Sequence, residues 1–237
     1  MMNYLVFGAS RGLGALFAHE LPQSGDTVWM ISRSEPELTA KDGVKRIWIN
    51  ADLGQSGVTR KIANQFAAQR LDVCIYNAGI WEENAFTEAY DYEAVPDEMT
   101  EKLIAVNLTS AITGIQKLLP ALRKSSNGKI ILIGASSGLE NSGWPEIANN
   151  ASKFGLRGVA HGLREVLRDD QIATTVINLG NVGVITYSDG TMSLEPVEDN
   201  TITIPIQDLL RTMRYLINLS SASVVKEIDL SAVSDRV

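Results

Sequence analysis

The chain has 237 residues, 45% of them hydrophobic and 21% charged, and a formal net charge of −7, which together predict a globular domain with a substantial core. No basic cluster is longer than a pair such as Arg123-Lys124, and no apolar stretch reaches the roughly 18 residues of a membrane span, so neither nucleic-acid binding nor a membrane-spanning segment is predicted. The single cysteine excludes an internal disulfide, and because the chain enters its first predicted strand without a basic leader and cleavage site, we expect a cytosolic (cytoplasmic) protein.

Short apolar runs alternate with helical patterns along the whole chain. The predicted strands cover residues 3–7, 27–32, 46–50, 72–76, 129–134, 173–178 and 224–230, and the predicted helices cover residues 13–21, 57–69, 98–124, 150–168 and 206–219. Strands that are apolar on both faces and alternate with helices indicate a parallel sheet with helices on both sides. We therefore predict a single three-layer α/β domain over residues 1–237, with a doubly wound, seven-stranded parallel sheet.

Two predicted connections, residues 80–97 and 183–205, are longer than the roughly two to six residues that are usual in such domains. Both begin where a predicted strand ends. In an open parallel sheet, ligands bind beyond the carboxyl ends of the strands. We expect these connections to form the walls of a substrate pocket.

A glycine-rich turn joins the first predicted strand to the first helix. It reads Gly8-Ala9-Ser10-Arg11-Gly12-Leu13-Gly14. Glycines at this spacing permit a tight turn in which backbone N–H groups at a helix N-terminus approach a pyrophosphate. A glycine pattern alone is a weak signal, but its position between a strand and a helix is the one that nucleotide binding requires.

Further segments follow this turn in a family's characteristic order. They are Ala51-Asp52-Leu53, Asn77-Ala78-Gly79, Val106-Asn107, Ala151-Ser152-Lys153-Phe154-Gly155-Leu156 and Asn178-Leu179-Gly180-Asn181-Val182. Together with the glycine turn they resemble the classical short-chain dehydrogenase/reductase family. The resemblance implies a Rossmann-type NAD(P)-binding fold with strand order 3-2-1-4-5-6-7, assembled as a homodimer or homotetramer. It also implies cofactor contacts from Gly8, Ser10, Arg11, Gly12, Leu13, Gly14, Arg33, Asp52, Leu53, Asn77, Ala78, Gly79, Lys153, Gly180 and Val182.

The form of the cofactor follows from charge at the end of the second predicted strand. Members of the family that prefer NAD(H) usually carry an acidic residue there to bind the ribose hydroxyls. Here the strand ends in Ser32-Arg33-Ser34, and Arg33 together with Arg11 could bind a 2′-phosphate. Each arginine alone could equally be a solvated surface charge, and Glu35 lies close by. The pattern favours NADP(H) over NAD(H).

The reaction centre departs from the family at its central residue. Asn149 stands four residues before Lys153, at the position of the family's catalytic tyrosine. A tyrosine can donate a proton to a substrate oxygen, whereas an asparagine amide has no titratable proton. The resemblance assigns Ser136, thirteen residues before Asn149, to the substrate carbonyl, Lys153 to the nicotinamide ribose and Asn107 to a proton-relay water. No metal site is predicted.

Several functions remain open at this point. A slow reductase would need another proton donor, and Tyr187 in the second long connection is the candidate, although it could simply bury its ring. A silent NADP(H)-binding sensor or scaffold is the principal alternative, and Val184 at the position of a family threonine that binds the carboxamide favours it. A non-redox biosynthetic enzyme is the third possibility. A Ser136–Lys153 hydrolase pair is disfavoured, because no nucleophile elbow surrounds Ser136.

The two long connections carry an excess of acidic residues. No lysine or arginine occurs between Leu71 and Glu101, or between Asp169 and Leu210. The resulting negative potential disfavours anionic substrates such as acyl carriers, unless these carboxylates only form a solvated surface. We therefore expect a neutral or cationic small-molecule substrate. Apolar surface for it is available from Trp81, Phe86, Tyr90, Tyr92 and Trp144.

Overall fold

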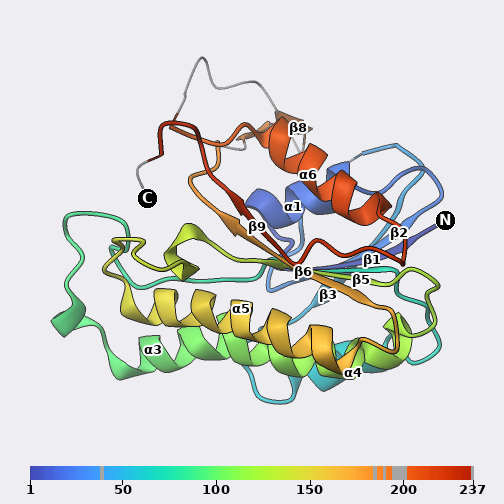
Figure 1. The fold of residues 1–237 in the computed structure, drawn as a ribbon, viewed down its shortest axis with the longest axis horizontal. Coiled ribbons are helices and arrows are strands. Elements are labelled where there is room, and N and C mark those ends of the chain that lie inside the picture. The colour runs from blue at the N-terminus through green and yellow to red at the C-terminus, as the bar shows by residue number, and fades with distance from the viewer. Residues whose placement is uncertain (38–39, 184–185, 189–190, 194–201, 236–237) are drawn as a thin grey trace.

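The computed structural model describes residues 1–37, 40–183, 186–188, 191–193 and 202–235, and its centre is a seven-stranded parallel sheet (Figure 1). The strands run in the order β3-β2-β1-β4-β5-β6-β9. Their bounds are β1 Asn3–Phe7, β2 Thr27–Ser32, β3 Lys45–Asn50, β4 Val73–Tyr76, β5 Lys129–Ile133, β6 Ala173–Leu179 and β9 Glu227–Leu230. The predicted fold class and strand order are confirmed.

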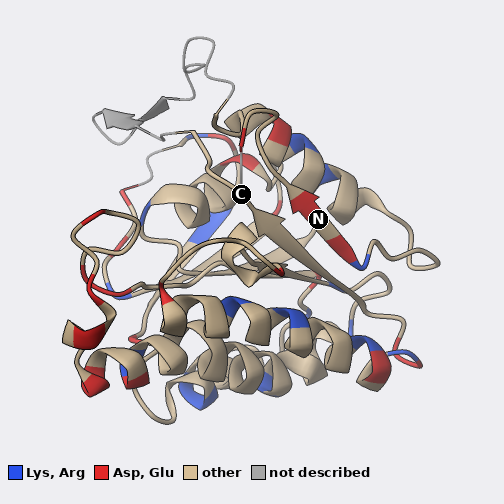
Figure 2. Cartoon of the chain, turned by 60° about the vertical axis from the view of Figure 1, so that its left-hand side comes forward, with Lys and Arg blue, Asp and Glu red and all other residues tan. Residues whose placement is uncertain are grey.

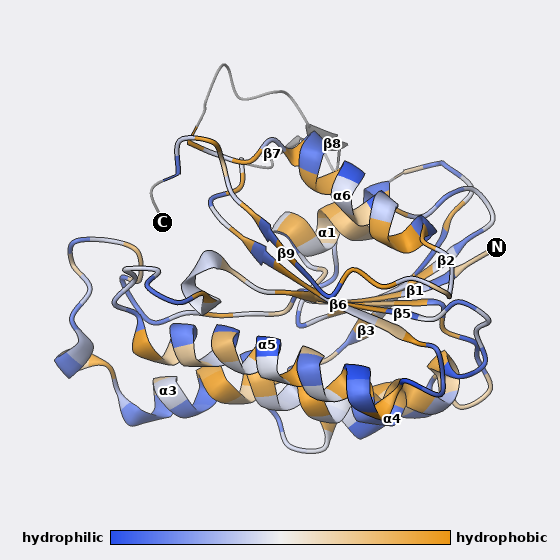
Figure 3. Cartoon of the chain, in the orientation of Figure 1, coloured by the Kyte–Doolittle hydropathy of each residue, from blue (hydrophilic) through white to orange (hydrophobic). Residues whose placement is uncertain are grey.

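Helices cover both faces of this sheet. One face carries α1 (Gly12–Glu20) and α6 (Ile206–Asn218), and the other carries α2 (Val58–Asn64), α3 (Asp97–Ile104), α4 (Ser110–Leu122) and α5 (Ile147–Val166). The alternation of side chains in β1 explains the two cores, because Leu5 and Phe7 pack under α2, α4 and α5 whereas Tyr4 and Val6 pack under α1 and α6. In Figure 3 the central strands are mainly hydrophobic, and the helices that cover the sheet carry both hydrophobic and polar residues.

The long helix predicted over residues 98–124 is divided in the structure. A π-helical turn, Ala105–Thr109, separates α3 from α4. Such turns are rare and are often found at functional sites, and this one contains Asn107. Its wider spacing is invisible to a pattern based on the ordinary helical period, so the sequence predicted one uninterrupted helix.

The predicted connection over residues 183–205 contains a small hairpin that the sequence analysis did not anticipate. Strands β7 (Thr186–Ser188) and β8 (Thr191–Ser193) pair antiparallel, and Val182 forms an isolated bridge with Ile204. Within the described part of the chain, no helix combines the length and apolarity needed to cross a membrane.

The sheet topology fixes where a ligand can bind. The chain passes from β1 outward to β2 and β3, then returns to place β4 on the opposite side of β1. This reversal opens a crevice at the carboxyl ends of β1 and β4, where dinucleotides bind in doubly wound folds. The glycine turn and the 80–97 connection both start at this edge.

Candidate functional site

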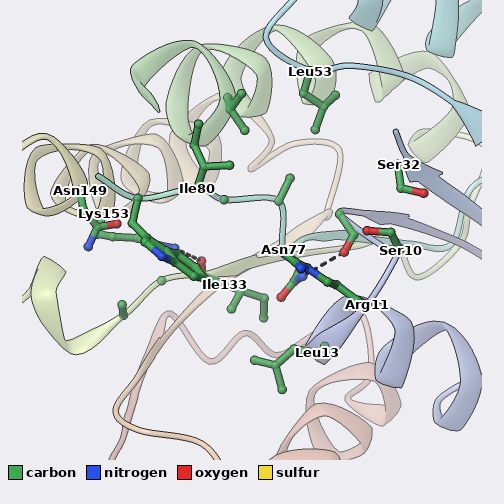
Figure 4. Close-up of a pocket in the computed structure, with 18 of the residues that line it drawn as sticks. Ser10, Arg11, Leu13, Ser32, Leu53, Asn77, Ile80, Ile133, Asn149 and Lys153 are labelled. Atoms are coloured by element: carbon green, nitrogen blue, oxygen red, sulfur yellow. Dashed lines mark hydrogen bonds between the residues drawn. The ribbon is translucent and has the colours of Figure 1, made fainter. Parts of the chain in front are cut away.

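A cavity of about 430 Å³ lies at the carboxyl ends of the central strands (Figure 4). Of the residues predicted to contact the cofactor, those that line it are Gly8, Ser10, Arg11, Gly12, Leu13, Arg33, Asp52, Leu53, Asn77, Ala78, Gly79, Lys153, Gly180 and Val182. Residues that the sequence analysis did not single out line it too, including Ser32, Ile80, Lys102 and Ile133. The structure thus brings segments from the six loops that follow β1 to β6 into one concave surface, and the volume falls in the range of small-molecule sites.

The glycines of the first turn are required by close backbone contacts. Gly8 has a φ of +78°, and a Cβ there would lie 2.7 Å from the Cα of Ala78. A Cβ on Gly14 would lie 2.0 Å from the carbonyl oxygen of Gly8, so Gly14 lets α1 pack against the turn and does not itself line the cavity. The Asn77 side-chain amide donates to the same Gly8 oxygen at 3.3 Å and ties the turn to β4.

Positive and polar groups gather at one end of the cavity. Ser10, Arg11 and Ser32 lie there in Figure 4, and Arg33 follows Ser32 at the end of β2. The backbone around Arg33 is held in place, because Asn50 donates to its carbonyl oxygen at 2.7 Å and the Ser32 hydroxyl donates to Ser34 at 2.7 Å. Both arginine side chains are exposed and available to a ligand phosphate.

Asn149 and Lys153 lie side by side at the other end of the cavity (Figure 4). They are one helical turn apart on α5, which places them on the same face. The Lys153 ammonium donates to the carbonyl oxygen of Ile133 at 3.2 Å. Desolvation by burial lowers the pKa of Lys153 to about 8. Asn149 is buried, and its side-chain amide donates to the Ser137 hydroxyl at 3.2 Å.

The serine next to this pair differs from the predicted one. Ser136 is buried at the start of a short 3-10 turn, Ser136–Gly138, and it is not among the residues that line the cavity. Ala135 lines the cavity in its place, and Ser137 is the serine that bonds Asn149. Contact between Ser136 and a substrate carbonyl therefore stays a prediction, and this geometry does not favour it.

Asn107 is fully buried beneath the cavity wall and does not line it. Its side-chain amide donates to the carbonyl oxygen of Ile80 at 2.8 Å and to the hydroxyl of Ser152 at 3.1 Å, and its oxygen accepts from the Ile80 N–H at 2.8 Å. Tyr76 anchors the same π-helical turn, because its hydroxyl donates to the carbonyl oxygen of Val106, and it also bonds the Ser110 hydroxyl at the start of α4. Asn107 thus joins α5 to the loop after β4, and its predicted water-binding role is untested.

Two buried glutamates connect the loop after β4 to the N-terminus of α5. Glu82 accepts from the backbone N–H groups of Ala148 and Asn149 at 3.0 and 3.1 Å, which satisfies donors that a helix start leaves unpaired. Glu146 accepts from the Phe86 N–H at 2.6 Å. In the sequence, Glu82 is simply one of the acidic residues of the 80–97 connection, because no sequence pattern shows that it is buried.

An aromatic cluster is formed by residues close in sequence to these glutamates. The rings of Trp81 and Phe86 are 6.0 Å apart and those of Phe86 and Trp144 are 5.4 Å apart, both edge to face. Trp81 and Phe86 line the cavity while remaining 55% and 46% exposed, so they are open to a ligand. Tyr187 lies in β7, but its side chain is outside the described residues, as is Val184.

Comparison with known proteins agrees with this geometry. Residues 3–192 match the family described as short chain dehydrogenase. The chain belongs to this family. Its relatives include a rhamnolipids biosynthesis 3-oxoacyl-(acyl-carrier-protein) reductase from Pseudomonas aeruginosa, 32% identical over 190 residues that cover 74% of this chain and 71% of the relative.

Solved structures with the same fold include complexes with NAD and with a derivative of NADP. An alcohol dehydrogenase from Thermococcus sibiricus complexed with 5-hydroxy-NADP has a TM-score of 0.76 and 20% identity, covering 100% of this chain and 99% of that one. An NADH-dependent reductase, A1-R′, complexed with NAD has a TM-score of 0.74 and 18% identity, covering 98% and 95%. At such low sequence identities these structures support the fold of this chain, but its cofactor preference has to be inferred from the residues of its own site.

Proposed function

We propose that this protein is an NADP(H)-dependent oxidoreductase that interconverts a small neutral or cationic carbonyl compound and its alcohol, using a proton donor other than tyrosine. The observation that carries the proposal is the gathering of the predicted nucleotide contacts in one cavity that ends at Lys153. We further propose that it works in the cytosol, as predicted from the sequence.

The residues present fit a dinucleotide phosphate. Gly12, the first residue of α1, lines the cavity, and a Cβ there would point into open space, so backbone N–H groups at the start of α1 can approach a pyrophosphate. Arg11 and Arg33 supply two cations for a 2′-phosphate, and the end of β2 has no carboxylate at the ribose position. These features favour NADP(H), with NAD(H) as the weaker alternative.

The bound cofactor would supply or accept the hydride, and the chain would supply binding, orientation and the proton. We assign Lys153 to the nicotinamide ribose, because it lies at the end of the cavity opposite Ser10 and Ser32. Asn149 can bond a substrate oxygen but cannot give it a titratable proton. Loss of a positioned acid costs typically about 10²–10⁴-fold in rate, which leaves a slow reductase possible.

The loop after β4 supports a substrate without negative charge. In Figure 2 the acidic residues, coloured red, are frequent along this loop and at the start of α3. Trp81 and Phe86 of this acidic loop offer apolar faces to the cavity, which suits a neutral or cationic molecule. The Pseudomonas relative is named for a 3-oxoacyl carrier substrate, and the acidic loop argues against an anionic carrier here.

A second function, that of a catalytically silent NADP(H)-binding sensor or scaffold, is favoured by a single observation. The family's proton donor is replaced by Asn149, whose amide is bonded to Ser137. A non-redox biosynthetic reaction in the same cavity is the third candidate. Both the silent binder and the non-redox enzyme would keep the nucleotide contacts but would not transfer a hydride.

One experiment separates these functions. NADPH and NADH are titrated by calorimetry, and NADPH oxidation is then followed with a panel of small ketones and aldehydes for the wild type, Asn149→Tyr and Tyr187→Phe. The reductase proposal expects tight NADPH binding and measurable turnover in the wild type. Tight binding with turnover only in Asn149→Tyr would establish the silent binder instead. Failure of both nucleotides to bind would remove the cofactor proposal altogether.

A further inference from the structure

We propose that the Lys153 ammonium replaces the missing tyrosine as the proton donor to the substrate oxygen. This inference rests on the proposed reductase function and gives Lys153 a second task in addition to binding the ribose. Lys153 lies beside Asn149, the residue that stands in place of the family's catalytic tyrosine and has no titratable proton to donate.

The distribution of titratable groups around the cavity favours Lys153. Among the described residues that line it, the titratable side chains are Arg11, Arg33, Asp52, Lys102 and Lys153. The first three belong to the nucleotide-binding turns after β1, β2 and β3, and the stem of Lys102 lies near Gly54, beside Asp52. Lys153 is therefore the titratable group at the Asn149 end, within the described part of the lining.

Asn149 leaves the approach to Lys153 open. Its short side chain is buried and donates to the Ser137 hydroxyl, whereas a tyrosine on the same backbone would extend a phenol ring into the cavity. Because Asn149 and Lys153 share one face of α5, a substrate oxygen that enters the space of the missing ring comes next to the ammonium. Gly79 borders the same space, since a Cβ there would lie 3.8 Å from Lys153 Nζ.

No described acidic side chain competes for the Lys153 proton. The charged groups packed around this part of α5 are Glu82 and Glu146, which accept from backbone N–H groups, and Arg157, which bonds Glu227. Lys153 itself has the Ile133 carbonyl as a partner and forms no ion pair among the described residues. Burial therefore brings its pKa to about 8, where an ammonium can release a proton near neutral pH.

When bound, the reduced cofactor would supply the hydride and both electrons to the substrate carbonyl carbon, where a C–H bond would form while the C=O π electrons moved to the oxygen. That oxygen takes a proton from Lys153 Nζ, which becomes a neutral amine and is reprotonated by solvent. The substrate is reduced by two electrons and the nicotinamide is oxidised by two. In the reverse direction the neutral amine accepts the alcohol proton.

The test compares wild type with Lys153→Arg, which keeps a hydrogen-bonding cation that does not lose its proton in proteins. We expect Lys153→Arg to keep NADPH affinity within about 3-fold and to lower single-turnover reduction by about 100-fold. In the wild type the reduction rate should fall as pH rises through about 8, and this decline should vanish in the variant. Alcohol oxidation should show the opposite pH trend in the wild type.

The outcomes separate this inference from the proposed function. A wild type that binds NADPH but reduces no carbonyl of the panel overturns the reductase proposal and the Lys153 step with it. A wild type that turns over, with Lys153→Arg equally fast or with the same pH profile, overturns only the assignment of Lys153. Loss of the wild-type pH decline in Tyr187→Phe would assign the proton to Tyr187 instead.

A second variant covers the case in which Lys153→Arg does not fold. Lys153→Ala is assayed with added ethylammonium, which carries transferable protons, and with tetramethylammonium, which carries the same charge without them. Restoration of turnover by ethylammonium alone supports proton donation by Lys153. An equal effect of both cations, or no effect of either, overturns it.

Discussion

Arg33 is the residue on which the cofactor preference should depend most. Its side chain is exposed at the edge of the cavity, and its backbone is held by Asn50. We expect Arg33→Ala to weaken NADPH binding about 10- to 100-fold, since charge-assisted bonds to a phosphate contribute about 1.5–3 kcal/mol. NADH affinity should stay within about 3-fold, because NADH has no 2′-phosphate. Calorimetric titration measures the dissociation constants of NADPH and NADH, whose ratio gives the cofactor preference.

Arg60 on α2 provides the matched control for this prediction, because it is exposed and does not line the cavity. Arg60→Ala should leave both affinities unchanged. An Arg33→Ala variant that loses NADPH and NADH affinity equally would show that Arg33 supports the turn and does not read the 2′-phosphate.

Lys153 should also reduce the stability of the folded state at neutral pH. Its pKa falls from about 10.5 in the unfolded chain to about 8 in the folded one, so between these values the unfolded state binds more protons and stability rises with pH. Below about pH 8 the burial cost is fully present. We expect Lys153→Met to raise the free energy of unfolding by about 1–3 kcal/mol at pH 7 and by much less at pH 10. Urea unfolding at both pH values measures this, with Lys61→Met on the exposed side of α2 as control.

At the scale of elements, the start of α5 depends on a carboxylate from another loop. Glu82 accepts from two N–H groups of the helix and is only 2% exposed, so its removal leaves buried donors unpaired. We expect Glu82→Ala to lower the free energy of unfolding by about 2 kcal/mol and to weaken NADPH binding, because the turn that carries Asn149 loosens. Denaturant unfolding and calorimetry measure both effects.

The neighbouring Glu83 is exposed and supplies the control. Glu83→Ala should change neither the free energy of unfolding nor that of NADPH binding by more than about 0.5 kcal/mol. Glu82→Gln keeps one acceptor oxygen, so its free energy of unfolding should lie between those of Glu82→Ala and Glu83→Ala. If Glu82→Ala were as stable as Glu83→Ala, the carboxylate would not be what holds the helix start.

Local pattern and tertiary context explain which elements could be predicted. Strands β1 and β2 were predicted to the residue, because unbroken apolar runs bounded by turn residues determine buried parallel strands. The glycine turn could also be predicted from the sequence, because its positive φ values and close backbone contacts require glycine. The serine was counted a fixed distance back from Asn149, whereas the cavity is lined by Ala135, because the shape of the 136–138 turn sets which side chain faces inward. The burial of Glu82 depends on packing between distant segments, which no local pattern records.

At the scale of the whole molecule, the outer surface of α4 and α5 carries large apolar side chains that are exposed in the described part of the chain. They are Ile112, Ile147, Phe154 and Val166, with exposures of 48%, 50%, 40% and 67%. The helices that carry them pack side by side on one face of the sheet. Apolar side chains gathered on neighbouring helices are typical of interfaces between subunits. We propose that this surface pairs two copies of the chain, as the family resemblance implied.

In a twofold dimer each substitution on this surface occurs twice, so charge placed there is strongly disruptive. We expect Phe154→Glu to raise the dimer dissociation constant at least about 10-fold, because two carboxylates would be buried without partners, each costing several kcal/mol. Analytical ultracentrifugation over a concentration series measures the constant. Tyr215→Glu on α6, at a residue 56% exposed on the opposite face, is the matched control and should assemble like the wild type. Dissociation by Tyr215→Glu and not by Phe154→Glu would move the interface to α6, and a wild type that sediments as a monomer would exclude the dimer.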